Sequence, residues 1–394
     1  MPQVWLLALA QAFAQAGTII FITYGGILGT ELAPGAGMAT LPLALFVAGV
    51  ALTSLPAALM MQRVGRRRVF MGSACFAACT ALLCAYSVSA QHYGGFCAAA
   101  FLFGTNNAVV QQYRFAAADF VSSGHTARAV STVMLGTLTA AFLWPEVGDR
   151  MRLAGGWSEF TGSFLAVAVL CLLAVAVLSR LPAMTVEKRE RQIAARPVGE
   201  ILRNPVCLVA IFAGVCSYAA MSFIMTATPI SMHMIDALSV AHTKRVISTH
   251  LIAMYLPSLF SGWLIRWLGI LRMMSLGVAC MLACVIVSAF VGHQFVHYLV
   301  ALALLGAGWN LLFVGGTTLL TSSYAPSDRF RAQGVNDLAV FGTQALVSLL
   351  AGPAIVHLHW QTLNLLTVPL LLLMVAAIGW LLWQRRAASR YRPQ

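Results

Sequence analysis

Residues 58–68 read Ala58-Leu59-Met60-Met61-Gln62-Arg63-Val64-Gly65-Arg66-Arg67-Arg68. The apolar stretches on the two sides of this basic segment, residues 38–60 and 69–89, are each long enough for a helix to cross the hydrocarbon core of a membrane, which takes about 20 residues. Charged side chains are costly inside that core, so the arginines of the segment belong at a membrane surface. We therefore expect two transmembrane helices joined by a tight basic loop.

Apolar stretches of the same length recur along the whole chain. Its 394 residues are 60% hydrophobic and only 9% charged, whereas roughly a quarter of the residues of a soluble domain are charged. This composition excludes an ordinary soluble fold, and we expect an all-α membrane protein of about twelve transmembrane helices. The expected spans are residues 4–29, 38–60, 69–89, 94–114, 129–149, 159–181, 205–229, 246–267, 273–292, 298–321, 335–357 and 360–384.

The basic residues are unevenly placed between the loops on the two sides of the membrane. A net charge of +13 would also suit a nucleic-acid partner, so the placement decides. With the N-terminus inside, twenty arginines and lysines lie on the inward side, and the outward side holds only Arg150, Arg152, Lys244 and Arg245. An excess of basic residues marks the cytoplasmic side of a membrane protein. We therefore expect both termini in the cytoplasm, the lipid bilayer as partner, and no nucleic acid.

The chain divides into two related halves. The longest polar connection, Arg180–Asn204, separates six spans from six, and a shift of 204 residues places Gly65 on Gly269 and Asn106 on Asn310. Repetition at one offset indicates a duplicated structural unit. The predicted domains are an N-terminal six-helix bundle at 1–181, a cytoplasmic linker at 182–204, a C-terminal six-helix bundle at 205–384 and a cytoplasmic tail at 385–394.

Two related six-helix halves are typical of one group of transporters, the major facilitator superfamily. The basic segment resembles the loop signature of that superfamily, which is Gly, then Asp-Arg, then Gly-Arg-Arg, except that Ala58 replaces the first Gly and Gln62 the Asp. The resemblance implies two pseudo-symmetric halves around a central site and transport by alternating access. The expected gating loops contain Gln62, Arg63, Gly65, Arg66, Asp119 and Arg128.

Soft side chains in two consecutive spans are candidates for a binding site. Met221 and Met225 are four residues apart on the seventh span, and His250 and Met254 are four apart on the eighth. Spacing by four puts each pair on one helix face, and the short outer loop between the spans brings the pairs to matching depth. Three thioethers and one imidazole suit Cu(I) better than a hard cation.

The same two pairs resemble the signature of the CcoA-like copper importers of bacterial inner membranes, which is Met-x-x-x-Met on helix 7 and His-x-x-x-Met on helix 8. The resemblance implies import of copper into the cytoplasm, as transported substrate rather than cofactor. It also implies a link to the assembly of copper enzymes such as cbb3-type oxidases, and to their assembly factors. The predicted accessory copper ligands are Met232, His233, Met234 and Cys216.

Two other functions fit the same composition. An organic-solute carrier, for flavin uptake or drug efflux, would line its cavity with Trp144, Trp309, Asn106 and Asn310, and its methionines would only pack. A membrane sensor or assembly factor would lack transport, although the chain offers it no soluble domain. We find no catalytic motif and expect no enzyme activity. The polar residues expected in a cavity are Gln11, Gln15, Asn106, Glu146 and Asn310.

Overall fold

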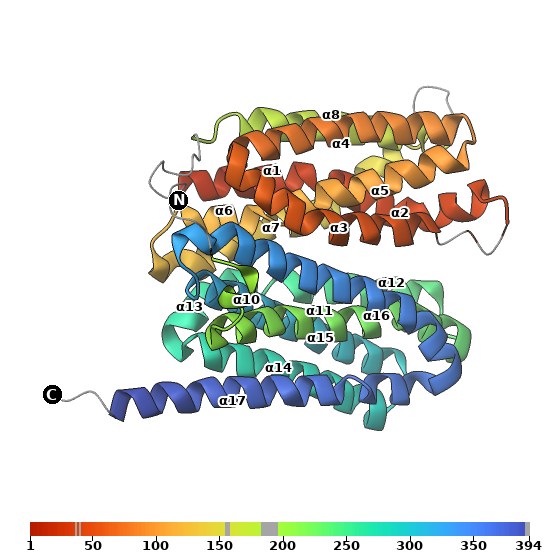
Figure 1. Cartoon of the computed structure of the whole chain (residues 1–394). Coiled ribbons are helices and arrows are strands. Elements are labelled where there is room, and N and C mark those ends of the chain that lie inside the picture. Colours follow the sequence, from red (N-terminus) through yellow and green to blue (C-terminus); the bar gives the residue numbers. More distant parts are fainter. Residues whose placement is uncertain (36–37, 39–40, 154–157, 183–195, 391–394) are drawn as a thin grey trace. The chain divides into compact units, whose positions relative to one another are not determined.

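The computed structural model describes residues 1–35, 38, 41–153, 158–182 and 196–390, and within these ranges the chain is helical without strands (Figure 1). Ten helices of the described part are long and apolar enough to cross a membrane, and a bent helix pair makes an eleventh. The remaining predicted span, 94–114, corresponds to α5 (Tyr93–Val110). The all-α transmembrane fold is thereby confirmed.

The helices of the first half of the chain follow one another with short connections. They are α1 (Pro2–Ala14), α2 (Ala16–Leu32), α3 (Leu41–Val64), α4 (Arg66–Ser89), α5 (Tyr93–Val110), α6 (Tyr113–Asp119), α7 (Thr126–Met151) and α8 (Thr161–Leu178). The helices of the second half are α10 (Val198–Ile201), α11 (Pro205–Ile230), α12 (Val240–Tyr255), α13 (Ser258–Leu268), α14 (Ile270–Ile286), α15 (Phe295–Thr321), α16 (Arg329–Leu365) and α17 (Val368–Arg390).

The basic segment is shorter as a loop than the sequence predicted. α3 continues to Val64 and α4 begins at Arg66, so the arginines extend the helices and Gly65 alone makes the turn. Its φ of 93° lies in a region that favours glycine. Gly269, its counterpart in the repeat, has a φ of 84° between α13 and α14. The repeat therefore extends from the sequence to the backbone conformation.

The predicted boundary between the last two spans falls at a backbone break. His359 inside α16 has a φ of 58°, a value that is uncommon for a residue other than glycine. The predicted spans 335–357 and 360–384 meet at this residue. α16 nevertheless resumes beyond the break and ends at Leu365.

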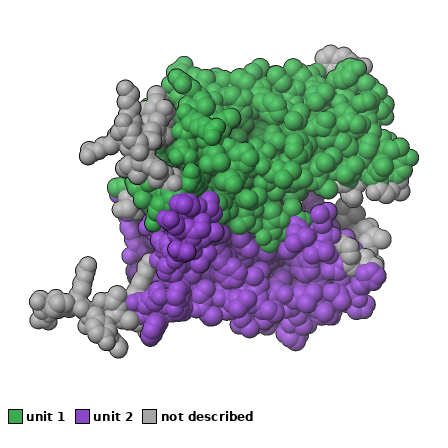
Figure 2. All heavy atoms as spheres, in the orientation of Figure 1, with its two compact units in different colours: residues 1–122, 132–196, 325–345 green, residues 123–131, 197–324, 346–394 purple. Residues whose placement is uncertain are grey.

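The chain forms two compact units, each of which is described by itself (Figure 2). Unit 1 comprises Met1–Ser122, Thr132–Arg196 and Ala325–Ala345, and unit 2 comprises Ser123–Ser131, Pro197–Tyr324 and Leu346–Gln394. Each unit thus includes a short segment from the other half of the sequence, because α7 and α16 contribute residues to both. The predicted division at 182–204 stays a prediction.

Candidate functional site

His250 on α12 is the most buried polar side chain among the predicted copper ligands, with 1% of its surface exposed. Its Nδ1 lies 2.8 Å from the carbonyl oxygen of Leu302 on α15. A carbonyl oxygen only accepts, so Nδ1 carries the hydrogen, and in the neutral ring Nε2 keeps its lone pair. Nε2 is buried and has no hydrogen-bond partner within the described ranges. The imidazole is therefore oriented with a free lone pair, as a metal ligand or an acceptor for a donor on a substrate requires.

The three methionines of the predicted site lie on the same two helices. Met221 on α11 and Met254 on α12 are each 7% exposed, and Met225 is half-buried. α11 and α12 both pack along α15 and share few direct contacts. The close meeting of the four side chains in one layer therefore stays a prediction. Across the described residues, no three His, Cys, Asp or Glu side chains gather as a metal site either.

The predicted accessory copper ligands Cys216 and Met232 have surroundings of their own. Cys216 is buried, and its thiol lies 3.8 Å from the carbonyl oxygen of Leu370 on α17, so it points to a different helix from the one that His250 contacts. Met232 is buried in the π-helical turn Ser231–Ile235 that continues α11. The side chains of His233 and Met234 lie outside the described residues.

An aromatic cluster forms where α11, α12 and α15 meet. We call it the Trp309 cluster, and its members are Tyr218, Tyr255, Trp309 and Phe313. The Trp309 ring stacks on Phe313 with centroids 5.2 Å apart, and it meets the edges of Tyr218 at 5.3 Å and Tyr255 at 5.9 Å. The indole Nε1 is buried and lacks an acceptor in the described part of the chain. The sequence interpretation missed Tyr218, Tyr255 and Phe313, although the spacing of Trp309 and Phe313 by four residues was a signal.

Asn310 ties this cluster to the backbone of α12. Its Nδ2 donates to the carbonyl oxygen of Met254 and to the hydroxyl of Ser258, both at 2.6 Å. Its Oδ1 is buried without a donor among the described residues. Asn310 thus fixes the position of α12 beside α15 and retains one acceptor.

In unit 1, polar side chains follow one face of the first span. We call Gln11, Gln15 and Thr18 the amide stripe; their spacing of four and three residues places them on one side of a helix. All three are at least nine-tenths buried. The Nε2 of Gln11 donates to Thr137 at 3.0 Å, whereas the side-chain oxygens of all three lack a donor within the described ranges. Gln15 joins α1 to α2, which together make one apolar helix, Pro2–Leu32, that is long enough to cross a membrane.

Trp144 on α7 supports the same part of the first span. Its indole donates to the carbonyl oxygen of Ala12 at 2.5 Å, and its ring stacks on Phe13 with centroids 5.8 Å apart. Trp144 is 7% exposed. It therefore holds the backbone next to the amide stripe.

Two other predicted cavity residues have surroundings of a different kind. Asn106 accepts a hydrogen bond at 2.8 Å from Ser73 on α4, so it links two helices of one bundle. Glu146 is 63% exposed and pairs with Arg150 one turn away at 2.9 Å. An exposed pair at this spacing contributes little to stability.

The predicted gating charges are divided between the units. In unit 1, Arg66 pairs with Asp119 at 3.1 Å and donates to Gln333 on α16 at 2.8 Å. Arg128 belongs to unit 2, where its Cβ lies close to Gly262 on α13. Gln62 and Arg63 are half-buried and exposed, respectively. Arg66 and Asp119 therefore act together, and Arg128 has a separate environment.

A second charged pair of unit 1 joins Arg114, which the sequence also placed among the inner gating charges, to Asp337, which the sequence interpretation missed. Arg114 donates to Asp337 on α16, and Gln112 donates to the same carboxylate at 2.6 Å. Asp337 is fully buried. The signal was present, because a carboxylate inside a predicted span is a functional candidate by default.

Comparison with known proteins identifies the family. The model of the Major Facilitator Superfamily matches residues 5–294 and 210–394. The riboflavin transporter RfnT of Brucella anthropi is 39% identical over 379 residues, which cover 95% of this chain and 94% of that protein. The uncharacterized transporter YddS of Bacillus subtilis is 26% identical and covers 95% of this chain and 89% of its own length.

Solved structures show the same fold at low sequence identity. The transporter FucP in its outward conformation matches with a TM-score of 0.79 and 12% identity, over 96% of this chain and 98% of its own. A bacterial homologue of the iron transporter ferroportin matches with a TM-score of 0.69 and 13% identity, over 96% and 98%. The chain therefore belongs to the major facilitator superfamily and is a multi-pass secondary transporter.

Proposed function

We propose that this transporter carries a flavin of the riboflavin type into the cell. The observation that carries the proposal is the 39% identity to a riboflavin transporter over 95% of the chain. This similarity supports the organic-solute carrier better than the copper importer. We further propose, from the positions of the basic residues, that both termini face the cytoplasm of a bacterial inner membrane.

The Trp309 cluster supports a planar aromatic substrate. Sites for organic solutes are mostly apolar and aromatic with a few oriented polar groups, and aromatic rings pair best in offset-stacked or edge-to-face arrangements. The isoalloxazine ring of a flavin is large, flat and conjugated. The cluster provides aromatic rings, and the buried Nε1 of Trp309 provides a donor for a carbonyl oxygen.

The amide stripe of unit 1, taken by itself, is suited to hydrogen-bond the polar edge of a flavin ring. That edge carries an imide N–H between two carbonyl groups. A glutamine amide offers both an acceptor and a donor, and the Oε1 atoms of Gln11 and Gln15 are buried without donors in the described part of the chain. Leaving a buried acceptor unpaired costs about 1–3 kcal/mol. An imide N–H of the substrate would remove that cost.

Copper import remains a second candidate because of one observation. The Nε2 atom of His250 is buried and unpartnered within the described ranges, and Met254 lies one turn away on the same helix. A neutral imidazole and a thioether are suitable ligands for Cu(I). The pair Met221 and Met225 is carried by α11, which packs on α15 rather than on α12, so the complete ligand set has weaker support.

Growth of a riboflavin-requiring bacterium separates the two functions. Cells that express the protein should grow at limiting riboflavin, whereas cells with the empty vector should not. Met225→Leu is the discriminating variant, because it removes the sulfur of a half-buried side chain and nearly conserves its volume. The flavin proposal predicts the same growth for Met225→Leu as for wild type. The flavin proposal is wrong if the wild-type protein does not restore growth at limiting riboflavin. If the wild-type protein instead supports growth of cells at limiting copper, and Met225→Leu does not, copper is the substrate.

A further inference from the structure

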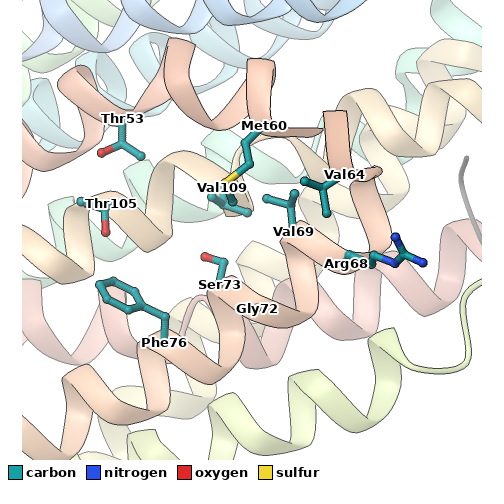
Figure 3. Close-up of a pocket in the computed structure, with 10 residues that line it drawn as sticks. All are labelled: Thr53, Met60, Val64, Arg68, Val69, Gly72, Ser73, Phe76, Thr105 and Val109. Carbon is teal, nitrogen blue, oxygen red and sulfur yellow. The ribbon is translucent and has the colours of Figure 1, made fainter. Parts of the chain in front are cut away.

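A groove runs along the side of unit 1 between α3, α4 and α5 (Figure 3). Its volume is about 330 Å³, roughly ten times the share of one water molecule in the liquid, which is about 30 Å³. Most of its lining is apolar and includes Met60, Val64, Val69, Phe76 and Val109. The groove therefore has room for a hydrocarbon chain and offers it apolar contacts.

The groove opens away from the interior of the bundle. Met60 and Phe76 are 50% and 41% exposed, whereas Met61 and Phe70 on the same helices are fully buried. In a chain that spans a membrane, apolar side chains exposed at the side of a helix contact lipid. Gly72 forms part of the wall, and a Cβ at that position would meet no atom within 4 Å. The missing side chain therefore leaves space in the groove.

One end of the groove is basic. Figure 3 shows Arg68 at this end and Phe76 with Thr53 towards the other. Arg66 pairs with Asp119, and Arg67 donates to the carbonyl oxygen of Ser179. Arg68 is exposed and forms no ion pair with the described acidic residues. Its charge is therefore available to an anion at the level where α3 meets α4.

The length of the groove matches one leaflet of a bilayer. Thr53 and Val64 are eleven residues apart on α3, which corresponds to about 16 Å at about 1.5 Å per residue. Half of a hydrocarbon core is about 15 Å thick. An occupant with its charge at Arg68 would therefore extend an apolar chain to the middle of the membrane.

We propose that this groove binds one anionic phospholipid, with the head-group phosphate on Arg68 and an acyl chain along Met60, Val69 and Phe76. Basic residues at the membrane surface attract anionic lipids of the cytoplasmic leaflet, and the end that carries Arg68 is the one that we propose to face the cytoplasm. The hydroxyls of Ser73 and Thr105 inside the groove donate to Asn106 and to the carbonyl oxygen of Leu102. Both hydroxyl groups thus have hydrogen-bond acceptors within the protein, so an acyl chain can lie beside them without leaving their donors unpaired.

The test is a lipid titration of the purified full chain in detergent, with the bound lipid counted by native mass spectrometry. Phosphatidylglycerol should fill one site ahead of phosphatidylcholine. Arg68→Gln should weaken that site about fivefold, as expected for one basic residue at a lipid surface, and Arg68→Lys should restore most of the binding. Gly72→Leu should fill the groove and remove the site.

Two matched controls keep the result specific. Arg63→Gln removes an exposed charge of the same segment that does not line the groove, and Gly379→Leu makes the same substitution at an exposed glycine of α17 with no atom within 4 Å of its Cβ. Both should bind the lipid as wild type does. The proposal is wrong if Gly72→Leu or Arg68→Gln binds as wild type does. It is equally wrong if Arg63→Gln weakens binding as much as Arg68→Gln, or if the two lipids bind alike.

Discussion

Trp309 is the residue on which the proposed substrate site depends most. Its buried ring contacts the rings of Tyr218, Tyr255 and Phe313, and yet its indole N–H has no acceptor in the described part of the chain. A buried donor without a partner is costly. A substrate carbonyl that accepts from this donor would explain why the side chain is tolerated there.

Replacing Trp309 should weaken riboflavin uptake. Stacking of a base on an aromatic side chain is worth about 1–3 kcal/mol, so Trp309→Ala should raise the KM for riboflavin by about five- to 150-fold, and Trp309→Phe should raise it less. The matched control is Trp263→Ala, which removes an exposed tryptophan of the same unit. Uptake of labelled riboflavin into cells measures both. An unchanged KM in Trp309→Ala would exclude the cluster from the site.

The local spacing of His250 and the methionines predicted only part of their surroundings. The i, i+4 spacing predicted that each pair shares a helix face, and α11 and α12 are helices over the relevant residues. Spacing alone did not reveal that α15 is the common neighbour of both helices. The partner of the His250 imidazole, the Leu302 carbonyl, lies 52 residues away in sequence and had no local signal.

At the level of the helices, glycines let neighbouring helix backbones in the first bundle come into close contact. A Cβ on Gly104 of α5 would overlap the carbonyl oxygen of Phe46 on α3. Small residues let membrane helices approach closely, and association in lipid depends on such packing. Gly308, the counterpart of Gly104 in the repeat, is likewise close to Met281 and to the carbonyl oxygen of Gly277 on α14. The same device thus occurs in both bundles.

Gly104→Ala should therefore destabilise the protein. The added methyl group meets backbone, which cannot rotate away, and overpacking of this kind costs about 1–3 kcal/mol. Gly72→Ala is the matched control, because its Cβ meets open space and alanine favours a helix over glycine by about 1 kcal/mol. Thermal unfolding in detergent should show a lower Tm for Gly104→Ala and an unchanged or higher Tm for Gly72→Ala. Equal Tm values would contradict the close contact.

The existence of the elements could be predicted from the sequence, but their ends could not. Apolar stretches of about 20 residues mark a membrane span whatever the rest of the chain does. Helix ends in this protein depend on contacts outside the hydrocarbon core, so α3 and α4 continue through the arginines and meet at Gly65. The break of α16 at His359 was located because polar residues interrupt the apolar pattern there.

At the scale of the molecule, residues far apart in sequence form a buried charged network in unit 1. Arg114 and Gln112 both donate to Asp337, which is more than 220 positions later in the chain. Asn336 also donates to this carboxylate at 2.9 Å. Breaking a buried pair by removal of one partner costs about 3–5 kcal/mol, because the remaining charge is uncompensated.

Asp337→Asn should lower both the Tm in detergent and the rate of riboflavin uptake into cells, because Arg114 would lose its counter-charge. The double variant Arg114→Gln/Asp337→Asn should recover part of the lost Tm, since it removes both charges. Glu146→Gln is the control, as its exposed pair with Arg150 should matter little. A single variant Asp337→Asn with the Tm and uptake of wild type would show that the pair has no such role.

The all-α transmembrane fold of the molecule was predictable, whereas its cargo was not. The fold depends on apolar stretches that recur over the whole chain. The cargo depends on a few side chains whose neighbours are set by packing, and similar folds carry unrelated substrates. The two soft pairs favoured copper, and full-length similarity to a riboflavin transporter favours a flavin instead.

Uptake by the purified chain in proteoliposomes tests the flavin proposal most directly. Labelled riboflavin and copper are offered separately, with an inside-negative membrane potential or a pH gradient imposed in turn, and with Trp309→Ala as the variant and empty liposomes as the control. We expect saturable riboflavin accumulation that Trp309→Ala reduces, and copper accumulation no higher than in empty liposomes. Copper accumulation that depends on His250, with no riboflavin uptake under either gradient, would contradict the flavin proposal.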